Sequence, residues 1–413
     1  MNRNIKLLLG SNMLSHIGTG ISMIALPWIL IKEFEGEQSY AITIVLLNLF
    51  NILILPYAGT LIDRFSRKSI MLLVEGVGLT LNLLFIVLAV MLDEASWQLM
   101  ALIFLNGTLY SFHYPSRFAL AQEVTPTAYY KQINSWLEIQ GQTAFILAGG
   151  LTGVLLEYTS LPMVLLIDAL SYFFGFLMLA NIKVEKKEVT TIAHIPAETV
   201  GNKIREGIIF FKQSPRLAAL FLGGAIPFSI VMTLHYVVPI HVAKTLEESA
   251  QIMGWHEGIW AIGAMLAGVF VPVMIRKMGA SETLVYPFAS FVIALVVIAL
   301  SPSVITFLAI SIMLGWGNSG VRVARNTLMM EEVDNQMMGR LGSLTMTFSK
   351  GMQMLLVGLS ALAIGYFNTY MVLGALASTA GVALIVVWRA RKEESVDLPP
   401  CTCERQLSHC ACA

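Results

Sequence analysis

The sequence predicts an all-α membrane protein with twelve transmembrane helices, arranged as two pseudo-symmetric halves of six helices each. Three observations predict this class: the composition, the length of the stretches without charged residues, and the uneven placement of Lys and Arg. The 413 residues are 56% apolar, and only 13% are Asp, Glu, Lys or Arg, against about 25% in a soluble domain. The zero net charge excludes a basic nucleic-acid-binding protein, and the 12 Tyr and 21 Phe exclude a disordered chain. Most of the surface must therefore face lipid.

The charged residues delimit the spans, because Asp, Lys or Arg at the middle of a bilayer is costly. Stretches without any charge cover residues 7–31, 38–62, 76–92, 95–116, 139–156, 217–243 and 258–275. Another stretch, 158–182, is interrupted only by Asp168. Two longer stretches hold about twice the roughly 20 residues that one helix needs. They cover 283–321, with a break at Ser301-Pro302-Ser303, and 351–388, with a break at 365–369. Twelve spans result, and runs this long indicate helices rather than barrel strands.

Lys and Arg concentrate in loops on one side of the predicted membrane. Of the 26 basic residues, only Lys32 and Lys244 fall in loops on the other side, where eight acidic residues lie. The positive-inside rule then predicts a multi-pass protein of the cell membrane with both termini in the cytoplasm. The first span is too long for a signal-peptide core and lacks a cleavage site of small residues, so we expect it to be retained.

Matching residues recur at a constant offset and indicate a duplication. Ala58-Gly59 recurs as Ala267-Gly268, a separation of 209 residues, and Glu123-Val124 recurs as Glu332-Val333 at the same offset. The predicted domains are an N-terminal half (1–182), a polar cytoplasmic linker (183–215), a C-terminal half (216–392) and a cytoplasmic tail (393–413). Two parallel halves of six spans are typical of major facilitator transporters.

A basic motif follows the second span. It reads Gly59-Thr60-Leu61-Ile62-Asp63-Arg64-Phe65-Ser66-Arg67-Lys68. This resembles the Gly-x-Leu-x-Asp-Arg-x-Gly-Arg-Lys signature of the major facilitator superfamily, with Ser66 in place of the second Gly. By this resemblance, Gly59, Asp63, Arg64, Arg67 and Lys68 form a cytoplasmic latch that closes the cytoplasmic side in the outward-facing state. A carboxylate such as that of Asp63 is favoured at a helix N-terminus of the other half.

Further segments resemble a bacterial efflux branch of this superfamily that includes macrolide and siderophore exporters. They are Ala25-Leu26-Pro27-Trp28, His113-Tyr114-Pro115, Val124-Thr125-Pro126, Asn134-Ser135 and Asp168-Ala169-Leu170-Ser171-Tyr172. The resemblance implies a monomeric bacterial antiporter without a cofactor. It would export amphipathic small molecules by proton-coupled alternating access, as multidrug-resistance transporters do. One alternative is a dedicated exporter of a siderophore, a peptide or a metal complex.

The chain contains no Gly-Lys dipeptide and therefore no Walker A loop to bind ATP. The energy would come from an ion gradient, from the substrate gradient or from a partner subunit, and the resemblance favours antiport. A rival class is an intramembrane receptor or enzyme. Against it, the spans contain no metal-ligand pair and no nucleophile–base set at helical spacing.

Polar side chains inside the spans are the candidate site residues, because they are costly in lipid. By the resemblance, spans one, four, seven and ten line the transport cavity. The cavity candidates are Asn12, His16, Asn106, Tyr110, His113, His235, Trp316, Asn318 and Arg322. The candidates for proton coupling are His16, Asp168 and Glu138, since a His titrates near neutral pH. Structural hydrogen bonding is the alternative for His16 and Asp168. Ion pairing at the cytoplasmic surface is the alternative for Glu138 and also for Glu75.

All four cysteines lie in the last thirteen residues. Cys401, Cys403, His409, Cys410 and Cys412 could bind Zn or Cu(I), which prefer soft ligands. The alternative is an unstructured tail without a metal. Disulfides are not expected in the reducing cytoplasm.

Overall fold

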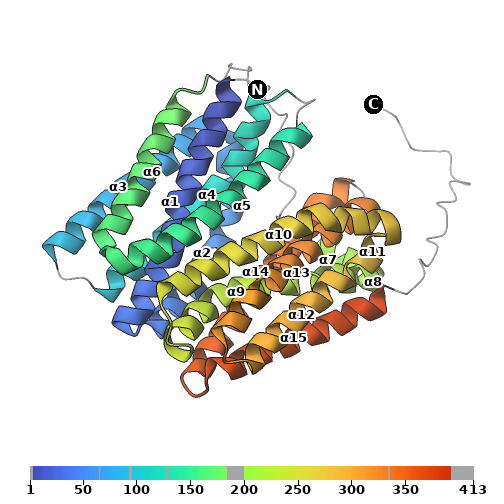
Figure 1. The fold of residues 1–413 in the computed structure, drawn as a ribbon. Helices are drawn as coiled ribbons and strands as arrows, with labels where there is room; N and C mark the ends of the chain where they lie inside the picture. The colour runs from blue at the N-terminus through green and yellow to red at the C-terminus, as the bar shows by residue number, and fades with distance from the viewer. Residues whose placement is uncertain are drawn as a thin grey trace, which may run out of the picture.

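The computed structural model describes residues 3–64, 66–92, 95–126, 130–183, 200–333 and 335–391. Helices make up almost all of these ranges, and Figure 1 shows them in two groups. The first group is α1 (Arg3–Phe34), α2 (Glu37–Arg64), α3 (Arg67–Met91), α4 (Ser96–Val124), α5 (Tyr130–Tyr158) and α6 (Leu161–Ala180). The second is α8 (Pro215–Gly223), α9 (Ile226–Ile240), a π-helical turn η2 (His241–Thr245), α10 (Ala250–Met278), α11 (Ala280–Thr283), α12 (Val285–Leu300), α13 (Val304–Glu332), α14 (Asn335–Ile364) and α15 (Thr369–Ala390).

The all-α, twelve-helix prediction is confirmed. Eleven helical segments in the described residues are long and apolar enough to cross a membrane, with Pro215–Thr245 and Ala280–Leu300 each counted as one. The 29-residue α4 stands in the place of the fourth predicted span. The predicted breaks at Ser301-Pro302-Ser303 and at 365–369 separate α12 from α13 and α14 from α15.

The helices of the two groups correspond in order. Displaced by the offset of 209 residues, α4 falls on α13 and α6 falls on α15. In the sequence, the two groups are connected through α7 (Val200–Gln213), an amphipathic helix in the predicted linker. This helix packs on α14 of the second group. The two groups meet chiefly where α5 crosses α10 and where α2 crosses α14.

Proline shapes the seventh span. Pro227 stands in the first turn of α9, where a missing N–H costs nothing. Pro239 lies near the end of α9, and the chain continues as the π-helical turn η2. A proline removes one backbone hydrogen bond and forces such local changes of helical pitch. Pro227 and Pro239 therefore coincide with irregular helix geometry, whereas α1 continues through Pro27.

Three helices begin earlier than the charge pattern predicts. α3 begins at Arg67, α10 at Ala250 and α14 at Asn335. As a result Glu75, Glu257 and Lys350 lie inside helices rather than at span ends. The expected position of Glu75 at a membrane surface is wrong, because its side chain is 0% exposed and faces α1 and α4.

Candidate functional site

A central cavity of about 330 Å³ lies between the two groups of helices. Its walls come from α1, α2, α4 and α5 on one side and from α9, α10, α13 and α14 on the other. Most lining side chains are apolar, with Met23, Phe145 and Trp260 among the larger ones. The polar lining residues are Ser22, Tyr40, Asn48, Asn51, Asn106, Tyr110, Ser111, His235, His256, Glu257, Lys350 and Gln353. A mostly apolar pocket with a few polar groups is typical of a small-molecule site.

Contacts between the two groups close one end of this cavity. Lys244 pairs with Glu37, Lys32 Nζ donates to the Ala243 carbonyl at 3.4 Å, and the Tyr40 hydroxyl donates to the His235 carbonyl at 3.1 Å. Towards the end that carries the N-terminus, the two groups diverge (Figure 1).

The ion pairs between described residues at that diverging end lie within one group each. Arg67 pairs with Glu123 and Arg216 with Glu332, both at 3.8 Å. The cavity is therefore closed at the end where α1 meets α2.

Two charged side chains reach the cavity from the second group. Glu257 Oε1 on α10 lies 3.9 Å from His235 Nδ1 on α9. Lys350 Nζ on α14 donates to Asn48 Oδ1 on α2 at 3.0 Å. The charge pattern does not assign Glu257 and Lys350 to the cavity, because each stands next to a charge-free stretch and is predicted to be its boundary.

Some polar atoms in the cavity wall are unsatisfied. Within the described part of the chain, the amide nitrogen and oxygen of Asn106, Asn51 Oδ1 and Gln353 Oε1 form no hydrogen bond. Unpaired buried polar groups are costly unless a ligand or water satisfies them. Asn51, Asn106 and Gln353 also line the cavity, so a change of rotamer would bring these amides within reach of a bound molecule.

A buried polar network fills the first group of helices beside the cavity. The Ser15 hydroxyl on α1 lies 2.8 Å from both Glu75 carboxyl oxygens on α3. His113 Nε2 on α4 lies 3.5 Å from Glu75 Oε1. The network thus ties α3 to two helices that line the cavity.

His16 belongs to the same network. Its Nδ1 lies 2.7 Å from the Asn12 carbonyl oxygen, and its Nε2 lies 2.9 Å from Arg117 Nη1 on α4. A carbonyl can only accept and a guanidinium can only donate, so the partners specify Nδ1 as the protonated nitrogen and Nε2 as the acceptor. Both ring nitrogens are engaged in this arrangement, and His16 has no site for a further proton unless Arg117 moves.

Asp168 on α6 is surrounded by hydrogen-bond donors. Ser22 donates to Oδ2 at 2.6 Å, and Asn82 donates to Oδ2 at 3.5 Å. The Ser171 hydroxyl donates to the Asp168 backbone carbonyl at 2.7 Å and lies 3.3 Å from Oδ1. Its side chain is 0% exposed. Asp168 therefore holds α1, α3 and α6 together.

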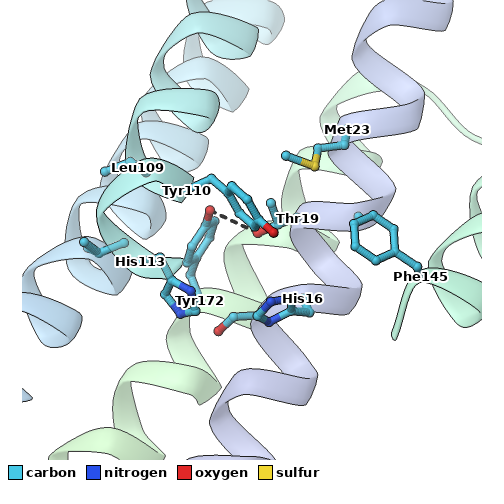
Figure 2. A pocket seen from close by; sticks show the side chains of 11 residues that line it. His16, Thr19, Met23, Leu109, Tyr110, His113, Phe145 and Tyr172 are labelled. Atoms are coloured by element: carbon cyan, nitrogen blue, oxygen red, sulfur yellow. Dashed lines mark hydrogen bonds between the residues drawn. The ribbon is translucent and has the colours of Figure 1, made fainter. Parts of the chain in front are cut away.

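A second, small cavity of about 20 Å³ lies between α1, α3, α4, α5 and α6, which is enough for one water molecule. Figure 2 shows His16, Tyr110, His113 and Tyr172 around it, with the hydrogen bond from Thr19 to the Tyr172 hydroxyl at 3.2 Å. Met23, Tyr110 and Phe145 line both cavities. The small cavity therefore lies next to the large one, within the first group of helices.

Of the nine predicted cavity residues, five line one or both cavities and four line neither. Asn106 and His235 line the large cavity, His16 and His113 the small one, and Tyr110 both. Asn12 is buried behind His16. On α13, Trp316, Asn318 and Arg322 line neither cavity, and the Trp316 ring lies 6.4 Å from that of Phe270. Among the coupling candidates, the Glu138 side chain lies outside the described residues.

The predicted latch is described only in part. Gly59, Asp63 and Arg64 end α2, and their side chains lie outside the described residues. Lys68 Nζ donates to the carbonyls of Ala180 at 2.8 Å and Ile182 at 2.7 Å. These carbonyls stand at the C-terminus of α6, where a cation satisfies unpaired oxygens and the helix dipole.

Replacing Lys68 by alanine is expected to destabilise the fold by about 0.3–1 kcal/mol, because the α6 terminus loses its cap. The thermal unfolding midpoint of the purified protein measures this, with Lys6→Ala, an exposed lysine on α1, as the control. Loss of transport with an unchanged midpoint would instead make Lys68 a gating residue.

The tail candidates Cys401, Cys403, His409, Cys410 and Cys412 lie outside the described residues, so metal binding there stays a prediction. Between residues 3 and 391, the described side chains contain no group of three or more His, Cys, Asp or Glu placed to hold a metal ion.

Comparisons with known proteins bear on this site. The family model described as "Major Facilitator Superfamily" matches residues 8–349. The chain is 22% identical over 374 residues to the uncharacterized MFS-type transporter YkuC of Bacillus subtilis, covering 87% of this chain and 85% of that protein. It is 22% identical over 369 residues to macrolide efflux protein A of Streptococcus pyogenes, covering 82% and 86%.

Solved transporters share the fold. A bacterial homologue of the iron transporter ferroportin in an inward-facing state gives a TM-score of 0.72 at 16% identity, covering 94% of this chain and 99% of that one. The nucleoside transporter NupG gives a TM-score of 0.70 at 14% identity, covering 95% and 100%.

Proposed function

The chain belongs to the Major Facilitator Superfamily, and from that premise we propose that it exports amphipathic small molecules from the cell in exchange for protons. The observation that carries the proposal is the central cavity between the two helix groups, closed at one end by Lys244–Glu37 and the neighbouring contacts. The similarity to macrolide efflux protein A over 82% of the chain supports export. The cavity lies within one chain, which supports a monomer.

The geometry of the closed end supports alternating access. By the positive-inside rule, the basic loops, the diverging end and both termini would lie in the cytoplasm. The substrate would enter there while Lys32, Glu37 and Lys244 hold the outer end shut. Separation of these contacts, together with closure of the cytoplasmic end by the motif around Asp63, would release the substrate outside the cell.

The cavity walls favour an amphipathic cargo. Aromatic and Met side chains such as Met23, Phe145 and Trp260 adapt to varied apolar shapes. The Glu257 carboxylate suits a cationic amine, and the amides of Asn51 and Asn106 suit hydroxyl groups. A macrolide with an amino sugar combines these three properties.

Proton exchange is supported by the ionisable groups that the bundle buries. Glu75 and Asp168 are both enclosed among the helices of the first half. Burying such groups within a membrane bundle is costly, and they commonly serve ion or proton transfer. The absence of a Gly-Lys dipeptide, and so of an ATP-binding loop, agrees with a gradient as the energy source.

Erythromycin accumulation in bacteria with and without the protein tests the proposal. Cells that produce the protein are expected to accumulate less erythromycin, and a protonophore is expected to abolish the difference. Equal accumulation would exclude macrolide export and favour the dedicated exporter of a siderophore, peptide or metal complex, which the Cys/His tail suggests. Reduced accumulation that a protonophore does not change would exclude proton coupling.

A further inference from the structure

We propose that the Glu75 carboxyl group is the proton-binding site of this transporter and that His113 transfers its proton to and from the small cavity. The inference rests on the proposed proton-coupled function and names the residues that would carry it. It assigns a role to a carboxyl group for which the sequence alone favoured a surface ion pair.

The first argument is the supply of donors around each buried carboxyl group. An ionised carboxylate offers about four acceptor positions. Among the described side chains, Glu75 receives one hydroxyl hydrogen, that of Ser15, which the two oxygens share. Asp168 receives hydrogen bonds from Ser22 and Asn82. The single hydroxyl hydrogen of Ser171 lies closer to the Asp168 backbone carbonyl, at 2.7 Å, than to Oδ1, at 3.3 Å. Asp168 is therefore built to remain an acceptor, whereas Glu75 has an oxygen free to hold a proton.

The second argument is the tight packing around the Glu75 carboxyl group. Gly175 on α6 faces it, and a Cβ atom added to Gly175 would stand 2.7 Å from Glu75 Oε2 and 2.5 Å from Ser15 Oγ. No side chain larger than hydrogen fits at this position while Glu75 and Ser15 keep their contact. The close packing of α1, α3 and α6 thus fixes where the carboxyl group lies.

Ionisable groups face Glu75 from the neighbouring helices. α4 contributes His113 and Arg117, α1 contributes His16, and α6 contributes Asp168 and Tyr172. Arg117 is hydrogen-bonded to His16 Nε2. Asp168 and Glu75 interact electrostatically, so the charge of one affects the other. Among these groups, His113 is the base whose nitrogen lies within 3.5 Å of a Glu75 oxygen.

The route to the substrate follows from the two cavities. Ser15 and His113, the two partners of Glu75, line the small cavity. Met23, Tyr110 and Phe145 line the small cavity and the central one. In the transfer step, the O–H bond of Glu75 breaks and an N–H bond forms at His113 Nε2, which leaves a carboxylate and an imidazolium. The imidazolium then gives the proton on Nδ1 to water in the small cavity.

The transfer changes the contacts of the cavity walls. A carboxylate attracts the imidazolium of His113 on α4 and accepts from Ser15 on α1, whereas a neutral carboxyl group holds both more weakly. α1 and α4 both line the central cavity. Proton binding at Glu75 therefore acts on the two helices that the substrate touches.

Infrared difference spectra between acidic and alkaline buffer test the site without any substrate. The purified full chain in lipid vesicles is expected to show a protonated-carboxyl band that disappears in alkaline buffer. Glu75→Gln is expected to lose the band, and the matched control Asp168→Asn is expected to keep it. If Glu75→Gln fails to fold, Glu75→Asp is expected to fold and to shift the band. A band that persists in Glu75→Gln, stays unshifted in Glu75→Asp or vanishes in Asp168→Asn alone would overturn the proposal, as would its absence from the wild type.

Transport in the same vesicles separates this inference from the proposed function. With erythromycin and an internal pH-sensitive dye, Glu75→Gln is expected to lose erythromycin-driven proton flux and to keep exchange of labelled for unlabelled erythromycin. Retained proton flux in this variant would overturn the inference alone. If the wild type moves no erythromycin but its carboxyl band depends on Glu75, the macrolide proposal fails and the proton site stands.

Discussion

Replacing Gly149 by alanine is expected to open the closed end of the cavity, whereas the same change at Gly150 is expected to leave it closed. Gly149 on α5 faces the backbone of Gly254 on α10, and an added Cβ atom would stand 2.8 Å from the Gly254 carbonyl oxygen. A Cβ atom added to Gly150 meets nothing within 4 Å. The two helices belong to different halves, so the clash is relieved when the halves separate at this end.

The expected effect is large because the clash is with backbone. Overpacking of a close contact costs about 1–3 kcal/mol, which corresponds to a shift of about 5- to 150-fold between the two conformations. Alanine raises helix propensity over glycine by about 1 kcal/mol, but this gain is common to both positions and cancels in the comparison. Erythromycin export by Gly149→Ala is expected to fall, since the cycle needs both conformations.

Labelling of a single cysteine in the cavity wall measures the shift. The cysteines all lie between residues 401 and 412, so replacing them by serine leaves a background without cysteine. With Met232→Cys in the cavity wall, a membrane-impermeant maleimide added outside the cells is expected to react faster in Gly149→Ala than in Gly150→Ala. Equal rates in the two variants would show that the α5–α10 contact does not control the closed end.

The fold was predictable because lipid imposes a simple rule on the outer surface of a membrane protein. Breaks such as Ser301-Pro302-Ser303 were found correctly, since proline and short polar residues end a helix whatever surrounds it. Interior charges follow another rule, because they face other protein groups or a water-filled cavity. For this reason the charge pattern predicts span ends at Glu75, Glu257 and Lys350, although their helices continue past them.

Local signals in the sequence could have corrected two of these boundaries. Ser66 precedes α3 and Ser249 precedes α10, and serine is a favoured residue before a helix. A search for helix starts, rather than for charge-free stretches alone, would have placed Glu75 and Glu257 inside their spans.

The partners of the site residues were beyond the reach of the sequence. Asn12 and His16 were expected on one helical face, and His16 does bond to Asn12, but through the backbone carbonyl. The other partner, Arg117, is 101 residues away and approaches because α1 packs on α4. Hydrogen bonds of this kind depend on the rotation of each helix about its axis, which the hydropathy pattern does not fix to within one side chain.

Exchange of Glu257 for glutamine is expected to lower the transport of cationic substrates selectively. Glu257 is a carboxylate in the cavity wall, with His235 as its near neighbour at 3.9 Å. A hydrogen bond to a charged group contributes about 1.5–3 kcal/mol, so the apparent affinity for erythromycin is expected to fall about 10- to 100-fold. An N-acylated derivative of the same macrolide carries no charge on nitrogen and is expected to lose little.

Lys350 provides the opposite test in the same cavity. Its ammonium group donates to Asn48 across the two halves, and Lys350→Met removes a positive charge that repels a cationic amine. The affinity for erythromycin is expected to stay equal or rise in this variant, whereas export of an anionic amphiphile is expected to fall.

The control for Glu257→Gln is Glu331→Gln, which changes an exposed carboxylate on α13 outside the cavity lining. It controls for the loss of a negative charge in general. Equal losses for charged and uncharged macrolides in Glu257→Gln would mean that Glu257 shapes the cavity without recognising charge.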